Sequence, residues 1–332
     1  GAMTHYSMLD LCPVVEGQGP KDAFRNALEL AQLAERQDFR RYWLAEHHNM
    51  IGIASAATSV LIGHIAAGTE RIRVGAGGIM LPNHAPLQIA EQFGTLETLF
   101  PGRIDLGVGR APGTDGATAA ALRQHLNADV NRFPEDVEEL LGYFQPERPG
   151  QQVRAVPGAG LDVPVWILGS SLYGAGMAAE FGLPYAFASH FAPADLLAAI
   201  ALYRRDFKPS IHLAKPYVMA GFNVIAADTD AEAEFLASSM QQSFVRLYTG
   251  KPGKFSPPQE GYFQSLPANV QATLNQVLGC SAIGSANTVW QKLNDFLART
   301  QVDEILVTGS TFSHTARLNS FEIASDVLKS LR

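Results

Sequence analysis

The segment RVGAGGIMLPNHAPLQIAEQFGTLETLFPGRIDLGV, residues 73–108, predicts a strand, a helix and a second strand in succession. Apolar runs of strand length open and close it, from Arg73 to Met80 and from Ile104 to Val108. Between these runs, apolar residues recur at helical spacing: Ile89, Phe93, Leu96 and Phe100. Two strands joined by a helical crossover lie parallel in one sheet, so this segment is a unit of an α/β fold.

The same alternation continues toward both ends of the chain. Six further apolar runs have strand length: Ser7 to Leu11, Tyr42 to Ala45, Val165 to Leu168, Tyr185 to Ala188, Tyr217 to Ala226 and Ile305 to Val307. Eight parallel strands with right-handed crossovers close into a barrel, and about 250 residues or more suffice for one. We therefore predict a single α/β domain, a (β/α)8 TIM barrel over residues 3–332. An open doubly wound sheet is the weaker alternative, because no Gly-x-Gly-x-x-Gly fingerprint joins a first strand to a first helix.

Composition excludes several classes of protein. Of the 332 residues, 47% are hydrophobic and 17% charged, which predicts a globular protein with a large core. The net charge of −7, without a Lys/Arg-rich block, argues against a nucleic-acid partner. Apolar runs stay below the roughly 18 residues of a membrane span. Cys12 and Cys280 have no metal-ligand spacing and indicate a reducing compartment, so we expect a cytoplasmic protein. Gly1 and Ala2 before Met3 are interpreted as a cleavage remnant.

Three segments are longer than ordinary connections between strands and helices. They are Ala111 to Phe133, Gln145 to Pro164 and Thr249 to Pro267. Long insertions in a barrel usually serve the active-site face, so we expect all three at the carboxyl ends of the strands. The last is rich in Gly and Pro and carries Tyr262 and Phe263, and it is either a lid over a ligand or a surface excursion.

Polar residues follow six of the eight predicted strands directly. They are Glu46, His47, His48 and Asn49; Asn83 and His84; Arg110; Ser170 and Ser171; Ser189 and His190; and Thr308, Ser310 and Thr311. The active site of a barrel lies at the carboxyl ends of its strands, so these residues predict a polar mouth over an apolar barrel. A metal site is not expected, because adjacent histidines on a regular strand point to opposite faces and acidic ligands on later strands are missing.

Two glycine-containing segments carry a further signal. Gly75, Gly77 and Gly78 crowd one strand, which predicts either close approach of a flat ligand to the backbone or tight packing against a helix. The segment GSSLYGAG, residues 169–176, offers hydroxyls and backbone N–H groups at a helix start, a suitable seat for a phosphate. Barrel phosphate sites more often follow strands seven and eight, so this position departs from the usual one.

Five segments in this order resemble the bacterial luciferase-like flavin-dependent monooxygenases, in particular their single-chain bacterial members of unknown substrate. They are WLAEHHN (43–49), VGAGGIMLPNHAPLQIAEQ (74–92), GRIDLGVGRAPGTD (102–115), ILGSSLYGAGMAAEFGLPYAFASHF (167–191) and EILVTGSTFSH (304–314). The resemblance spans nearly the whole chain. It implies a (β/α)8 barrel, reduced FMN or a deazaflavin as cofactor, and a homodimer.

The resemblance also implies roles for individual residues. His47 corresponds to the catalytic histidine, and a histidine can exchange a proton near neutral pH. The remaining residues are implied to bind the cofactor: Gly77 and Gly78 through a cis peptide under the flavin ring, Glu91 by supporting that strand, and Arg110, Ser170, Ser171, Tyr173 and Gly174 around the FMN phosphate. His48 is expected to face outward and to bind Glu46 or a neighbouring helix.

Two departures from the family pattern limit what carries over. The luciferase has a reactive cysteine just before the phosphate-binding arginine, where this chain has Gly109, so light emission is not expected. Its Glu-Ser phosphate motif stands here as Ser170 and Ser171.

Three functions follow from the sequence. The first is a two-component monooxygenase that takes reduced FMN from a separate, transiently bound reductase and uses O2 to oxygenate a small organic substrate. The chain has no nicotinamide fingerprint of its own, which is why a partner reductase is expected. The second is a deazaflavin-dependent oxidoreductase, and the third is a flavin-binding protein without catalysis.

Overall fold

The computed structural model describes residues 4–111, 113–124, 126 and 129–331; the proposed remnant at Gly1 and Ala2 lies outside them. In this part of the chain nine strands form one parallel sheet. They are β1 (His5–Asp10), β2 (Arg41–Leu44), β3 (Arg73–Met80), β4 (Ile104–Gly109), β5 (Val165–Gly169), β6 (Tyr185–Phe187), β7 (Val218–Ala226), β8 (Ser281–Gly284) and β9 (Glu304–Thr308). Because β6 also pairs with β7, all of them except β8 close into an eight-stranded barrel, as predicted.

The strand β8 was not predicted from the sequence. It pairs with the carboxyl-terminal part of β7, from Asn223 with Ser281 to Ala226 with Gly284, and so extends the sheet beyond the closed ring. Its four residues, SAIG, include two very small side chains and are too few to show an alternating pattern.

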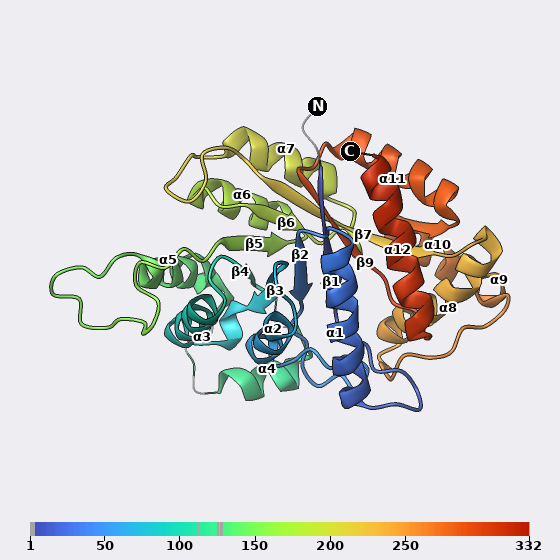
Figure 1. The fold of residues 1–332 in the computed structure, drawn as a ribbon, viewed down its shortest axis with the longest axis horizontal. Helices are drawn as coiled ribbons and strands as arrows, with labels where there is room; N and C mark the ends of the chain where they lie inside the picture. Colours follow the sequence, from blue (N-terminus) through green and yellow to red (C-terminus); the bar gives the residue numbers. More distant parts are fainter. Residues whose placement is uncertain (1–3, 112, 125, 127–128, 332) are drawn as a thin grey trace.

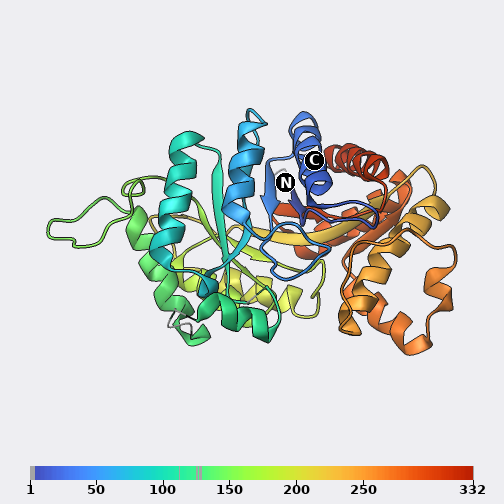
Figure 2. The same cartoon turned by 90° about the horizontal axis from the view of Figure 1, so that it is seen from below.

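Helices surround the barrel (Figures 1 and 2). They are α1 (Pro20–Arg36), α2 (Thr58–Ala67), α3 (Pro86–Leu99), α5 (Phe133–Phe144), α6 (Leu172–Phe181), α7 (Leu196–Asp206), α8 (Asp230–Tyr248), α11 (Ala286–Thr300) and α12 (His314–Ser330), with the shorter α4 (Gly116–Arg123), α9 (Tyr262–Ser265) and α10 (Ala268–Val277) in the connections. In α1 the buried side chains recur at helical spacing, and this face covers the barrel wall. No helix in the described ranges is long and apolar enough to cross a membrane.

Alternate residues of each strand enter the barrel. Trp43 and Trp166 fill its centre, with ring centroids 5.1 Å apart in an edge-to-face arrangement. Leu9, Met219 and Leu306 pack beside them. The outward residues of the same strands belong to the larger core under the helices.

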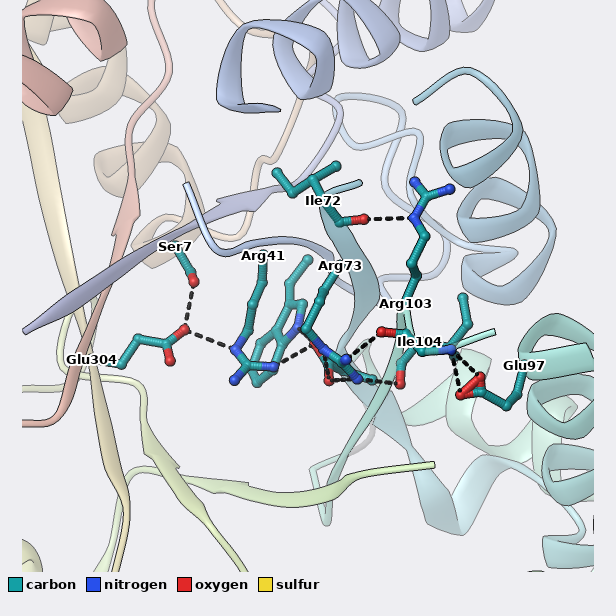
Figure 3. A network of polar contacts seen from close by, with 11 residues as sticks. Ser7, Arg41, Ile72, Arg73, Glu97, Arg103, Ile104 and Glu304 are labelled. Carbon is teal, nitrogen blue, oxygen red and sulfur yellow. Dashed lines mark hydrogen bonds and ion pairs between the residues drawn. The ribbon is translucent and has the colours of Figure 1, made fainter. Parts of the chain in front are cut away.

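A buried network of charges closes the barrel at the amino ends of its strands (Figure 3). Arg41 lies 2.9 Å from both Asp105 and Glu304, and Arg73 lies 2.8 Å from Asp105. Burial raises the pKa of Asp105, but the two arginines outweigh it and hold that pKa below its usual range. In barrels this face contributes to stability rather than chemistry, so the opposite end is where the site must lie.

The three long segments lie at both ends of the barrel, not at one. Ala111 to Phe133 follows β4 and lies at the carboxyl ends, where the Gly113 carbonyl accepts a hydrogen bond from the His48 amide. Gln145 to Pro164 runs from α5 to the start of β5 and projects from the amino-terminal side (Figure 1), so its predicted position was wrong. Thr249 to Pro267 contacts the loop after β1, where Phe255 pairs with Val15.

Candidate active site

Glu46 joins the ends of β2 and β3. It is buried, and its carboxylate accepts hydrogen bonds from four donors: the Met80 amide at 2.9 Å, Asn83 Nδ2 at 3.0 Å, His84 Nε2 at 2.8 Å and His48 Nε2 at 2.6 Å. Burial alone raises its pKa, but these bonds, led by His84, lower the pKa below its ordinary value. Glu46 is therefore an ionised anchor that fixes the loops around its neighbour His47.

The two adjacent histidines differ as predicted. His48 binds Glu46 at 2.6 Å, whereas no side-chain hydrogen bond of His47 is found in the described part of the chain. The backbone of His47 is held by its amide, which donates to the Ser55 carbonyl at 3.0 Å. Burial, aided by His48 and opposed by Glu46, lowers the pKa of His47 below 6.5. His47 thus does not have the unshifted pKa of a free histidine, and in the fold it is an uncharged imidazole at neutral pH.

His190, which follows β6, is a site residue to which the sequence argument assigned no role. Burial, aided by a charge on His47, lowers its pKa to about 4. The two histidines, 143 positions apart by number, are therefore within electrostatic range of each other. In the sequence, the only signal for His190 was its place, with Ser189, directly after a predicted strand. Its pairing with His47 arises only when the barrel closes.

Gly77 and Gly78 lie in β3, and the peptide bond between them is cis, as predicted. A side chain at Gly77 would meet the Trp43 ring at 2.7 Å, and one at Gly78 would meet Leu168 at 2.0 Å. These glycines thus leave room for side chains inside the barrel. The alternative reading, tight packing of this strand against a helix, is not what the structure shows.

The expected support of this strand by Glu91 is not seen. Its carboxylate makes no hydrogen bond to Gly77 or Gly78 among the described contacts. Instead it adds to burial and Glu139 in raising the pKa of Tyr143, on α5, to about 12. The carboxylate that holds the end of β3 is Glu46, through the Met80 amide.

A second cluster lies at the ends of β4 and β5. The Arg110 guanidinium carbon is 4.0 Å from the centre of the Tyr173 ring, a cation–π contact that orients the arginine. Ser171 is the N-cap residue of α6 but forms no side-chain cap bond, so the first N–H groups of the helix stay available. Ser170 and Gly174 adjoin this turn. Arg110 has no carboxylate partner within the described ranges, and together these groups fit an anion such as a phosphate.

Comparisons with known proteins show what the chain as a whole is similar to. The family model described as luciferase-like monooxygenase matches residues 5–320. The chain is 54% identical over 326 residues to a luciferase-like monooxygenase of Escherichia coli strain K12, covering 98% of this chain and 97% of the relative. It is 38% identical over 263 residues to the N-acetyl-S-alkylcysteine monooxygenase of Bacillus subtilis strain 168, covering 75% of each. The crystal structure of apo-MsnO8 superposes with a TM-score of 0.91 at 31% identity, covering 98% of both chains.

Proposed function

Because the chain belongs to the luciferase-like monooxygenase family, we propose that it is an FMN-dependent monooxygenase of the two-component type. Reduced FMN, delivered by a separate reductase, supplies the electrons with which O2 gives one oxygen atom to a small organic substrate and the other to water. The observation that carries the proposal is the cluster of Arg110, Tyr173 and the start of α6, which fits a phosphate dianion. A homodimer is part of the same proposal, from the family resemblance.

The residues of the chain divide the work between two clusters. Arg110, Ser170, Ser171 and Gly174 would bind the phosphate, and Tyr173 would hold the guanidinium in place. Gly77 and Gly78 would adjoin the flavin ring. His47, uncharged and without a side-chain partner, would hold or release a proton next to the reacting groups. Glu46 and His48 position His47 by fixing the loop around it.

Arg110→Ala is expected to weaken FMN binding at least about tenfold, or about 1.4 kcal/mol. The variant removes a guanidinium that would bind the phosphate but leaves the ring site intact. Isothermal titration with FMN and with riboflavin, which lacks the phosphate, measures the effect. Arg299→Ala, which changes an exposed arginine on α11, is the control and should bind FMN like the native protein.

The native protein should also bind FMN more tightly than riboflavin. Equal affinities would show that the phosphate seat is wrongly placed. The same titration with the deazaflavin cofactor decides the alternative that the sequence left open, because an oxidoreductase of that kind would bind the deazaflavin in preference to FMN.

The pH dependence of turnover should report the lowered pKa of His47. If the uncharged imidazole is the active form, kcat/KM falls on the acid side with a midpoint below 6.5 and rises to a plateau above that midpoint. The direction follows from burial, which disfavours the protonated ring. The pH must therefore fall below the ordinary histidine pKa before His47 is protonated and the base is lost. An acid limb centred above pH 7 would contradict the role of His47.

A further inference from the structure

The loop after β6 is fixed to β7 on both sides of His190. Ser189 donates its hydroxyl to the Gly221 carbonyl at 2.7 Å, and Asn223 donates its side-chain amide to the His190 carbonyl at 2.6 Å. Both partners lie on β7, on the same side of the strand as Met219, which packs inside the barrel. The backbone of His190 is therefore held at the mouth of the barrel.

Glycine at position 221 makes the place of the His190 ring possible. A Cβ atom at Gly221 would stand 2.1 Å from Nδ1 of His190, a distance that no side chain could tolerate. The Phe191 ring packs edge-on against the imidazole with 4.9 Å between centroids. The imidazole therefore lies directly over the inward-facing position of β7 and is confined there.

This confined ring has unused hydrogen-bonding capacity. Nδ1 of His190 is buried and has no partner among the described residues. A buried polar atom without a partner destabilises a fold, so a ligand group is a natural explanation for its presence.

Four other polar residues that follow β2, β3 and β6 are already engaged. His48, Asn83 and His84 all bind Glu46, and Ser189 binds Gly221. His47 and His190 stand apart from them, because no side-chain hydrogen bond of either is found in the described ranges. At this part of the mouth, the two imidazoles are thus the side chains still free to form a hydrogen bond with a molecule that enters.

We propose that His190 is a second substrate-binding residue, which together with His47 holds the reacting group of the organic substrate, and that this group is uncharged. The proposal rests on the proposed function for the identity of the site. It names the chemistry of the reacting end only: a carbonyl, hydroxyl or thioether that can form one hydrogen bond with an imidazole.

The requirement for an uncharged group follows from the surroundings of the pair. Both rings are uncharged at neutral pH, because burial lowers the pKa of His190 to about 4 and that of His47 below 6.5. Glu46, next to His47 in the chain, has its carboxylate occupied by four donors and cannot pair with a cation. A charge placed between the two rings would therefore be desolvated without a partner, which is strongly unfavourable.

The geometry is tested on the FMN-free protein by NMR titration of ¹⁵N-labelled histidines. His47→Phe is expected to raise the pKa of His190 by about half a unit or more, since the repulsion between the two protonated rings is gone. Gly221→Ala should raise it too, because the new methyl group displaces the ring from its buried position. The controls are His212→Phe, between α7 and β7 at the other end of the barrel, and Gly142→Ala, on α5 with open space at its Cβ position. A His190 pKa unchanged in His47→Phe would overturn the pairing, and one unchanged in Gly221→Ala would overturn the placement of the ring against β7.

Substrate contact is tested on the FMN-loaded protein with two probes of equal chain length, 2-hexanone and hexanoate. The ketone should shift the ring signals of His47 and His190 in a saturable manner, and hexanoate should bind at least about tenfold more weakly. His190→Phe should weaken ketone binding by a similar factor while the FMN affinity stays within about twofold of native. Equal binding of the two probes, or unchanged ketone affinity in His190→Phe, would overturn the proposal. If the native protein does not bind FMN, the proposed function fails, whereas the titration of the FMN-free protein still decides the pairing.

Discussion

His47→Ala is expected to lower the oxygenation rate by about 10²- to 10⁴-fold at saturating reduced FMN, the usual contribution of one proton-transfer group. The imidazole of His47 is uncharged, lacks a side-chain partner among the described residues and is positioned by the loop that Glu46 anchors. Flavin affinity should change little, because the groups assigned to the phosphate lie elsewhere, directly after β4, between β5 and α6, and in the first turn of α6. Oxygen consumption with a panel of aldehydes, ketones, aromatics and thioethers measures the rate.

His48→Ala is the matched control at the neighbouring position. His48 donates a hydrogen bond to Glu46 at 2.6 Å, so its loss should mainly lower the free energy of unfolding, by about 1–3 kcal/mol. Native turnover in His47→Ala together with lost turnover in His48→Ala would reverse the two assignments and end the proposed role of His47.

The second large effect is expected at the opposite end of the barrel. Asp105→Asn should lower the free energy of unfolding by about 3–5 kcal/mol, because it leaves the buried Arg41 and the partly buried Arg73 without their shared carboxylate. Asp105 is fully buried and also accepts a hydrogen bond from the Trp43 indole at 3.1 Å, so the variant disturbs the barrel centre as well. Chemical denaturation of the native protein and the variant gives the difference.

An exposed ion pair supplies the control for this prediction. Asp295 and Arg299 are 3.1 Å apart on α11, both well exposed, and Asp295→Asn should change stability by no more than about 0.5 kcal/mol. If Asp105→Asn were as mild as Asp295→Asn, the network at the amino ends would not be a determinant of stability.

The barrel could be predicted because apolar runs of strand length alternate with helical patterns along the whole chain. Each strand that enters the closed ring has an apolar run long enough to recognise, and β8 was missed because its four residues are short and small. The segment from Gln145 to Pro164 was assigned to the wrong end from its length alone. Its place between α5 and β5 requires the amino-terminal side, since a connection that enters a strand lies at that strand's start.

The site was predicted in part, and the limits are physical. The family resemblance implied that Arg110 and Tyr173 lie in one pocket, and the two are in contact because β4 and β5 are neighbouring strands of the barrel. Three features could not be predicted: the pairing of His190 with His47, the four donors on Glu46 and the lowered pKa of His47. They depend on which segments of the chain pack side by side and on how deeply those segments are buried. Glu91 is the opposite case. The resemblance implies that it supports β3, whereas in the fold its carboxylate acts on the pKa of Tyr143.

A crystal structure of the FMN complex tests the central proposal most directly. The account predicts the phosphate between Arg110 and the turn at residues 170–174, the flavin ring beside Gly77 and Gly78, and the imidazole of His47 next to the ring. FMN bound elsewhere on the barrel, or a phosphate without contact to Arg110 and the start of α6, would contradict it.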